Sequence, residues 1–321
     1  MSIEAYIKAF SSLRTDKAAS RWSEDTKHRA PHKPLLLMSV LDLFAQGVIN
    51  ANLIEPNLEL SEVFNLYWAK VMPPDTNGNL ALPFYHLQSD NFWHLLPRPG
   101  YEQTLKSQVR SVIQLREFTF GATLDDELYE ILQSEKDRNT LQTVLISTYF
   151  ASDDLRRRLQ TQSSINLDAY QYSKQLLEQA RKREPLIFED VQEPVRDQGF
   201  RRAVVAAYDH RCAFCGVRVL TPINHTAVEA AHIIPWSYSH NDNPNNGLAL
   251  CKLCHWSFDE GMVSVSGKYK ILVSPQLNTN DNIAGHMGTL SRRDLILPID
   301  EVFYPEPDYL AWHRRERFYH H

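Results

Sequence analysis

Two histidines and an asparagine in the C-terminal third have the types and spacing that hydrolysis of a phosphodiester bond requires. His232 ends an apolar stretch, Asn246 ends the polar loop that follows, and His255 comes soon afterwards. This hydrolysis needs an activated water, a positive centre beside the phosphate and help for the leaving oxygen. Histidine takes a proton from water near neutral pH, and its neutral ring also binds divalent cations. We therefore expect His232 to be a general base and His255 a metal ligand.

Two further residues complete this expected site. Asn246 cannot titrate, so we expect its amide to fix the loop and to orient His232 by a hydrogen bond. Three other asparagines compete for that role, namely Asn241, Asn243 and Asn245. Asp259 lies four residues after His255, so on a helix its carboxylate faces the same side and is a candidate second ligand of the cation.

Four cysteines surround this constellation, and they are the only cysteines in the chain. They form two CxxC pairs, Cys212 with Cys215 and Cys251 with Cys254. Each pair has the spacing of half a tetrahedral zinc site, and a site with four protein ligands is closed and structural. A disulfide framework is disfavoured in a chain of 321 residues without a secretion signal. We expect a structural zinc ion that holds the segment 216–250 at both ends.

The elements that position these residues follow from the hydrophobic pattern. Residues 227–232 and 247–250 are expected to be strands, and residues 253–259 a helix, which together form a ββα unit. An amphipathic helix over 199–208 leads into the first cysteine pair. Two strands, 262–265 and 269–273, are expected to follow, and a final helix is expected around 308–317.

The N-terminal half has a different, mainly helical pattern. Helices are expected over 3–13, 35–47 and 60–71, short strands or a hairpin over 80–96, and helical structure again from 104 to 159. The segment 160–196 is rich in Gln, Lys, Arg and Glu and is expected to be a helical or loose linker. We therefore predict domains at 1–159 and 197–321.

Bulk composition limits the possible classes of protein. A hydrophobic fraction of 43% and a charged fraction of 23% are typical of a globular chain. No apolar run is long enough for a membrane span, and the N-terminus lacks the pattern of a signal peptide, so we expect no membrane partner and a cytoplasmic location. The net charge of −5 gives no global attraction to nucleic acid, so any DNA contact requires a local basic surface.

The order His232, Asn246, His255 within two CxxC pairs resembles the HNH, or His-Me finger, endonucleases in their zinc-bearing McrA-like form, over residues 205–265. The resemblance implies a DNA endonuclease with His232 as general base, Asn246 as positioning residue and His255 as ligand of a catalytic Mg²⁺ or Mn²⁺. Many relatives carry a ligand directly before the first histidine, where this chain has Ala231. Glu229 is the expected substitute, because alternate strand residues share a face.

A second resemblance covers residues 1–160. Residues 29–37 (RAPHKPLLL), residues 83–87 (PFYHL), Asp90 and Trp93 resemble the sulfur-binding domain that recognises phosphorothioate DNA in McrA-like restriction enzymes. Sulfur is larger and less hydrated than oxygen, so a shallow apolar dent near Pro83 should favour it. The expected contacts to sulfur, phosphates and bases are Lys27, His28, Arg29, His32, Lys33, Leu82, Pro83, Phe84, Tyr85 and Arg110.

The sequence thus predicts an α+β protein with a mainly helical N-terminal DNA-reading domain, a helical linker and a C-terminal ββα-metal domain with structural zinc. The leading hypothesis is a modification-dependent restriction endonuclease that reads phosphorothioate DNA and cuts double-stranded DNA nearby. One such motif cuts one strand at a time, so a homodimer is expected. Two alternatives stay open: a nuclease that reads a methylated base in an aromatic cage, and a zinc-stabilised DNA-binding module that does not cleave.

Overall fold

The computed structural model describes residues 2–76, 78–106, 109–183, 191–221, 225–278 and 285–320. Contacts divide the chain into two compact units, one of residues 1–167 with 221–225 and one of residues 168–220 with 226–321. The division falls inside the segment that we expected to be a linker. Part of that segment, residues 184–190, lies outside the described residues. Its remainder is helical, because α8 runs over Asp153–Lys182 and α9 begins at Glu193.

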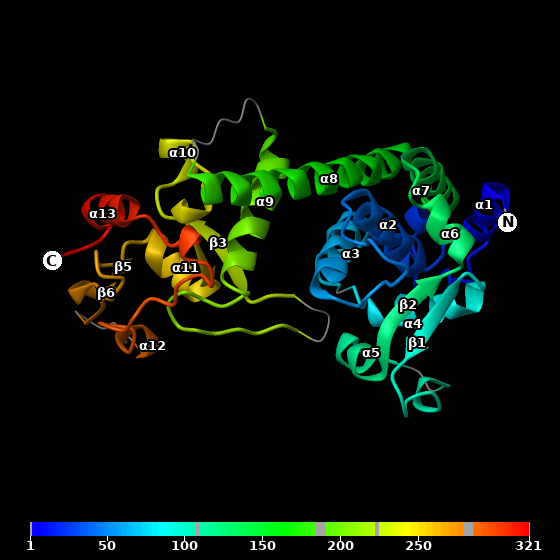
Figure 1. Cartoon of the computed structure of the whole chain (residues 1–321), viewed down its shortest axis with the longest axis horizontal. Helices are drawn as coiled ribbons and strands as arrows, with labels where there is room; N and C mark the ends of the chain where they lie inside the picture. The colour runs from blue at the N-terminus through cyan, green and yellow to red at the C-terminus, as the bar shows by residue number, and fades with distance from the viewer. Residues whose placement is uncertain are drawn as a thin grey trace. The chain divides into compact units, whose positions relative to one another are not determined.

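The first unit is a helical body with one small sheet (Figure 1). Its central helix α2 is buried at every position from 33 to 44, as the apolar run had predicted. Helices α3, α4 and α7 pack against it, α1 packs on α6 and α7, and α5 packs on α4. One antiparallel pair of strands belongs to the same unit. The bounds of these helices and strands are α1 Ile3–Ser11, α2 His32–Ala45, α3 Leu58–Val71, α4 Ala81–His86, α5 Val112–Phe118, α6 Asp126–Ile131 and α7 Glu135–Tyr149, with β1 Trp93–Pro97 and β2 Thr119–Leu124.

The expectation of strands or a hairpin over 80–96 was wrong for most of that segment. Helix α4 and a 3₁₀ turn, Leu87–Asp90, precede the single strand β1. The side chain of Asn79 accepts a hydrogen bond from the backbone N–H of Ala81 at 3.0 Å, which forms a turn directly before the helix. Leu80, Phe84 and Leu87 are all fully buried, and their spacing is the helical period rather than alternation.

Helices α5 to α8 confirm the helical pattern expected from 104 to 159, except that the strand β2 lies within it. Gly121 has a φ of +147°, which a helix does not tolerate, and a Cβ at this position would lie 2.3 Å from the carbonyl oxygen of Ile54. Arg110 is not helical either: Ser111 caps α5 by accepting from the N–H of Gln114, so Arg110 lies before the helix.

The second unit contains the expected ββα arrangement. Strands β3 and β4 pair antiparallel with His232 opposite Gly247 and Val228 opposite Cys251, and α11 follows β4 directly. The two later strands also pair as predicted. The bounds are α9 Glu193–Ala207, β3 Val228–His232, α10 Trp236–Ser239, β4 Gly247–Cys251, α11 Lys252–Asp259, β5 Val263–Val265, β6 Ile271–Val273, α12 Gly285–Gly288 and α13 Pro307–Glu316.

Helix α9 packs directly on the β3–β4 pair, and Gly247 permits this close approach. A Cβ at Gly247 would meet a methyl of Val204 at 2.5 Å and the ring of Phe200 at 3.1 Å. Both side chains belong to the buried face of α9. A glycine is therefore required where the loop of Asn246 enters the strand.

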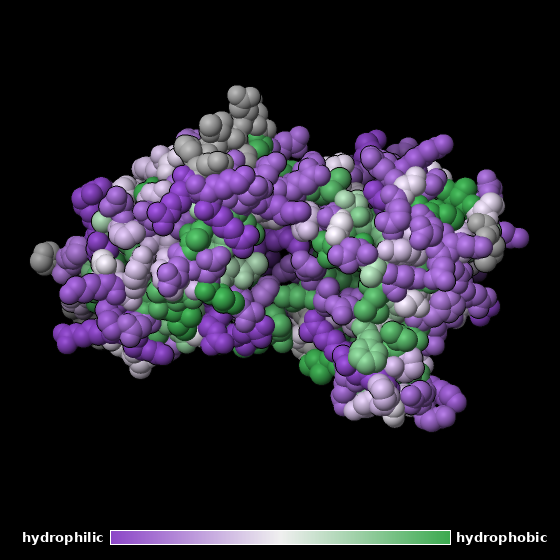
Figure 2. Space-filling view, in the orientation of Figure 1, coloured by the Kyte–Doolittle hydropathy of each residue, from purple (hydrophilic) through white to green (hydrophobic). Residues whose placement is uncertain are grey.

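Hydrophilic residues cover most of the face drawn in Figure 2, and hydrophobic residues reach it in smaller groups. No helix in the described ranges is long and apolar enough to cross a membrane.

The packing at Gly247 gives a first prediction. Gly247→Ala overpacks the contact with Val204 and Phe200 and should lower the free energy of unfolding by about 1–3 kcal/mol. Differential scanning calorimetry of the full chain measures this as a lower unfolding temperature. Gly267→Ala is the matched control, because nothing lies within 4 Å of a Cβ there. Equal unfolding temperatures for the two variants would contradict the argument.

Candidate active site and reader cavity

The four cysteines form one cluster in the second unit. Their Sγ atoms all lie within 4.8 Å of one another, and those of Cys215 and Cys251 are 3.8 Å apart. A tetrahedral zinc ion with Zn–S bonds of about 2.3 Å places its sulfurs about 3.8 Å apart, so the cluster fits this ion. The turn with the first pair is tied to β4 by a hydrogen bond from the N–H of Ala213 to the carbonyl of Ala249, 2.8 Å. All four thiols are free of disulfides, as expected.

The cysteines of the cluster differ in the pKa of their thiols. A hydrogen bond from the thiol of Cys254 lowers the pKa of Cys212 to about 5. The same hydrogen bond, together with burial and the neighbouring thiolates, raises the pKa of Cys254 far above its usual range. Zinc binds thiolates, so binding must release the protons that the other sulfurs hold.

His232 is the last residue of β3, directly before the loop. Its ring stacks on Phe200 of α9 with centroids 3.8 Å apart and planes 7° from parallel. Its Nε2 lies 2.7 Å from Oδ1 of Asp242, a carboxylate that is almost completely buried. Asp242 was missed by our sequence reasoning, and its signal was a single acidic residue among the asparagines of the polar loop.

Asn246 is fully buried and fixes the loop, but not in the way that we expected. Its Oδ1 accepts from the N–H of Ile234 at 2.9 Å, and its Nδ2 donates to the carbonyls of Ile234 and Asn241, both at 3.0 Å. The expected hydrogen bond from this amide to His232 is therefore wrong: these contacts occupy the amide, and His232 bonds to Asp242 instead. Asn246 ties the loop back onto the residues directly after β3.

His255 lies in α11 between two carboxylates. Its Nδ1 is 3.4 Å from Oε2 of Glu229, and its Nε2 is 3.4 Å from Oδ2 of Asp259. The carboxylates thus meet opposite nitrogens of one ring. Among the described residues, only the cysteines bring three or more ligand atoms within 4.8 Å of one another. The structure therefore does not unite Glu229, His255 and Asp259 as a single ligand set.

The pair of His255 Nε2 and Asp259 nevertheless fits a magnesium-type ion. Such ions take one or two protein carboxylates, and waters and substrate phosphate complete the shell. Glu229 is then placed to orient the imidazole through Nδ1, as carboxylates commonly do for metal-bound histidines. Burial raises the pKa of the Asp259 carboxyl, and the nearby charges of His255 and Arg317 oppose this effect.

A cavity of about 220 Å³ opens beside these residues. It brings His232 and Asp259 together with Arg317, which follows α13. Our sequence reasoning missed Arg317, although the basic end of the last helix was a visible signal. His313 also lines the cavity, but its ring stacks on Phe258 at 3.6 Å and burial lowers its pKa to about 4. His313 is therefore a neutral packing residue at physiological pH.

The first unit has a cavity of about 420 Å³ near the basic stretch. Of the expected reader residues, His32, Lys33, Leu82 and Pro83 line it. Eight residues outside the expected reader set share the wall, namely Arg14, Thr15, Asp16, Arg21, Trp22, Ala30, His86 and Ser89. Arg14 and Arg21 are exposed. Within the described chain, the buried hydroxyl of Thr15 has no hydrogen-bond partner.

Several expected reader residues have other contacts. Nζ of Lys27 donates to the carbonyls of Ser147 and Thr148 at the end of α7, at 2.7 and 3.0 Å. His28 donates from Nδ1 to the carbonyl of Trp22, and the guanidinium of Arg29 lies 5.9 Å from the ring centroid of Tyr149.

The remaining expected reader residues also lie away from the cavity. Phe84 and Tyr85 are buried in the core, and Arg110 is exposed. None of these six residues lines the reader cavity.

The two expected reader residues with ionisable side chains that line the cavity, His32 and Lys33, differ in character. His32 lies between Trp22 and Trp68, and burial lowers its pKa to about 4, so it is neutral. Nζ of Lys33 is 2.5 Å from Oδ2 of Asp90, so its charge is compensated. Arg21 also has a carboxylate partner at the cavity, Asp16 at 3.4 Å, but both of these side chains are exposed to solvent. The arginines at the cavity without a buried carboxylate partner are therefore Arg14 and Arg21.

Two family models match separate parts of the chain. Residues 4–162 match the family model described as "ScoMcrA-like, DNA sulfur-binding domain", and residues 212–266 match the model described as "HNH endonuclease". A solved structure titled "Modification dependent TagI restriction endonuclease" is 22% identical, with a TM-score of 0.29, over 41% of this chain and 44% of that chain. The chain thus covers less than half the length of that protein. No curated protein matches at a significant level.

The cysteine cluster gives a second prediction. The purified full chain should contain one zinc ion, and a strong chelator should remove it faster as the pH falls, because the thiolates become protonated. Removal of the zinc ion takes away several kcal/mol of binding free energy that stabilises the folded state. The unfolding temperature of the second unit should therefore fall by on the order of 20 °C. Metal analysis and calorimetry measure both effects, and Zn²⁺ but not Mg²⁺ should reverse them. A zinc-free chain with unchanged unfolding would refute the assignment.

Proposed function

Because the chain joins a ScoMcrA-like DNA sulfur-binding domain to an HNH endonuclease domain, we propose that it is a modification-dependent restriction endonuclease that binds phosphorothioate-modified double-stranded DNA and cuts it nearby. The observation that carries the proposal is the cavity that unites His232, Asp259 and Arg317, in a chain that also has an apolar, cation-rimmed reader cavity. One site supplies hydrolysis, and the other supplies selection.

The reader cavity suits a sulfur-bearing phosphate. Leu82, Pro83 and Trp22 supply an apolar wall, which favours a large and weakly hydrated sulfur over a solvated oxygen. Arg14 and Arg21 stand at the same cavity and can pair with the negative charge of the backbone. Lys33 has its own carboxylate partner, so we assign it to the wall and not to phosphate binding.

The hydrolytic site suits attack by water on a phosphodiester. His232 accepts a proton from the attacking water. Asp259 and His255 would hold a divalent ion, Mg²⁺ or Mn²⁺, and Glu229 would orient His255. When bound, such an ion supplies positive charge beside the scissile phosphate and the leaving oxygen. Arg317 adds a fixed positive charge to the same cavity, and Asn246 keeps the loop closed behind His232.

Reading of a methylated base finds little support in the structure. The aromatic residues that could have formed a cage are largely core: Tyr67, Trp68, Tyr85 and Trp93 are at most 9% exposed. Only Trp22 of that set faces the reader cavity. Phosphorothioate reading therefore remains the better proposal.

The state of the active assembly is part of the proposal. One HNH site cuts one strand at a time, so double-strand cleavage calls for two copies, and we propose a homodimer on DNA. Four free thiols that would bind zinc suit a reducing compartment, so we propose a cytoplasmic location.

Cleavage of matched duplexes tests the proposal. With Mg²⁺ or Mn²⁺, the full chain should cut a duplex with phosphorothioate linkages and leave an otherwise identical duplex intact. His232→Ala should lower the single-turnover rate by roughly 100- to 10,000-fold, because the general base is lost. Equal cutting of both duplexes would exclude the sulfur reader, and unimpaired cutting by H232A would exclude the base.

Binding measurements test the reader cavity separately. Arg21→Gln should weaken binding to modified DNA by about 1.4 kcal/mol, or tenfold. It should also reduce the slope of the logarithm of the binding constant against the logarithm of the salt concentration by about 1. Arg157→Gln is the matched control, since that arginine is 70% exposed on α8 and does not line the cavity. Fluorescence anisotropy at several salt concentrations supplies the numbers. If both variants bind alike, Arg21 does not contact DNA.

A further inference from the structure

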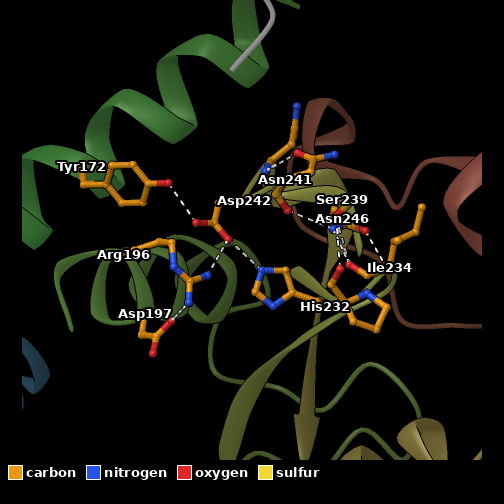
Figure 3. Close-up of polar contacts among 11 residues, drawn as sticks. Tyr172, Arg196, Asp197, His232, Ile234, Ser239, Asn241, Asp242 and Asn246 are labelled. Atoms are coloured by element: carbon orange, nitrogen blue, oxygen red, sulfur yellow. Dashed lines mark hydrogen bonds and ion pairs between the residues drawn. The ribbon is translucent and has the colours of Figure 1, made fainter. Parts of the chain in front are cut away.

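Asp242 is the centre of a buried polar network directly behind His232 (Figure 3). Its Oδ1 lies 2.7 Å from Nε2 of His232 and 3.5 Å from the guanidinium of Arg196, and its Oδ2 accepts from the hydroxyl of Tyr172 at 2.9 Å. Only 2% of its side chain is exposed. A carboxylate in such a place is costly unless it is well paired. The carboxylate of Asp242 is paired with three residues from three elements, namely His232 of β3, Arg196 of α9 and Tyr172 of α8.

The partners of Asp242 decide the direction of its hydrogen bond to His232. Burial and the neighbouring carboxylate raise the pKa of Tyr172, so its phenol stays protonated and donates. Arg196 can only donate. A carboxylate paired in this way offers acceptor lone pairs, so Nε2 of His232 carries the proton. The other ring nitrogen, Nδ1, then has a free lone pair, and no partner for it occurs in the described ranges.

The surroundings hold this geometry in place. The stack on Phe200 fixes the plane of the imidazole. Gly199 allows α9 to approach α8 closely, because a Cβ there would lie 2.7 Å from the ring of Tyr172. Arg196 also stacks over Trp236 at 4.1 Å and pairs with Asp197, so its position does not depend on Asp242 alone.

We propose that Asp242 is a positioning residue for hydrolysis: it holds His232 as the Nε2–H tautomer, so that Nδ1 is the atom that accepts the proton of the attacking water. The water oxygen forms a bond to phosphorus as the bond from phosphorus to the leaving ester oxygen breaks. The water proton goes to Nδ1, and the leaving oxygen takes a proton from solvent. The carboxylate then balances the charge of the imidazolium, as in other carboxylate–histidine pairs. This inference rests on the proposed function.

Single-turnover cleavage by zinc-loaded full chains tests the inference by a double-mutant cycle. Asp242→Asn keeps the shape of the side chain and should lower the rate roughly 10- to 100-fold, with DNA affinity unchanged. In an H232A background, D242N should lower the rate no further, because its effect passes through His232. Asp209→Asn is the control, since its exposed partner is Arg218, and it should cleave normally. A cleavage rate of D242N within about threefold of wild type would overturn the proposal. So would a double variant whose rate is lowered by the product of the losses seen in the two single variants.

A second measurement does not depend on cleavage or on the folding of a variant. In the wild-type chain with ¹³C- and ¹⁵N-labelled histidine, the ring signals of His232 are assigned by through-bond correlation to its own backbone signals. The proposal requires a protonated Nε2 and an unprotonated Nδ1, and the opposite tautomer would overturn it. If the wild-type chain cuts no DNA but has the expected tautomer, the proposed function fails while the pairing with Asp242 stands.

Discussion

The antiparallel pairing of β3 with β4 determines where both ends of the nuclease unit lie. At one end of the ladder, Val228 stands opposite Cys251, so the strand pair meets the cysteine cluster. At the other end, His232 stands opposite Gly247, beside the loop that Asn246 closes. A shift of one residue in this register would turn His232 to the opposite face. The cysteine cluster and the cavity beside His232 are thus held at a fixed separation by one short ladder.

The two ends use different means to stabilise a small sheet. Two strands alone have little apolar surface to bury, and such a pair needs support from outside itself. At the cysteine end, four sulfurs that fit a metal ion tie the strand to α11. At the histidine end, α9 packs across Gly247. The hydrogen bonds of Asn246 hold the loop against the end of β3. The strand pair is therefore supported by the clustered cysteines and by hydrogen bonds as well as by hydrophobic packing.

Sequence reasoning succeeded where spacing alone determines proximity. The CxxC pairs, the strands at 227–232 and 247–250 and the helix of His255 all follow from local patterns, and the structure contains them. It failed where the partner of a residue lies far away in the chain. Asp242 meets Tyr172 and Arg196 only after α8 and α9 have folded against each other, and no local pattern in the loop indicates this.

The reader unit shows the same limit. The basic stretch and Pro83 were visible in sequence, and Lys33, His32 and Pro83 do share a cavity. The charge at that cavity comes instead from Arg14 and Arg21, while Lys27 is engaged at the end of α7. Composition locates a binding region, but burial and pairing decide which of its charges a ligand can reach.

The position of Arg317 in the chain ties the cavity to the last helix of the second unit. This residue follows α13, while His232 ends β3 and Asp259 ends α11. Helix α13 packs mainly on β5 rather than on the β3–β4 pair. Detachment of α13 alone would therefore take one positive charge out of the cavity wall and leave the β3–β4 ladder intact.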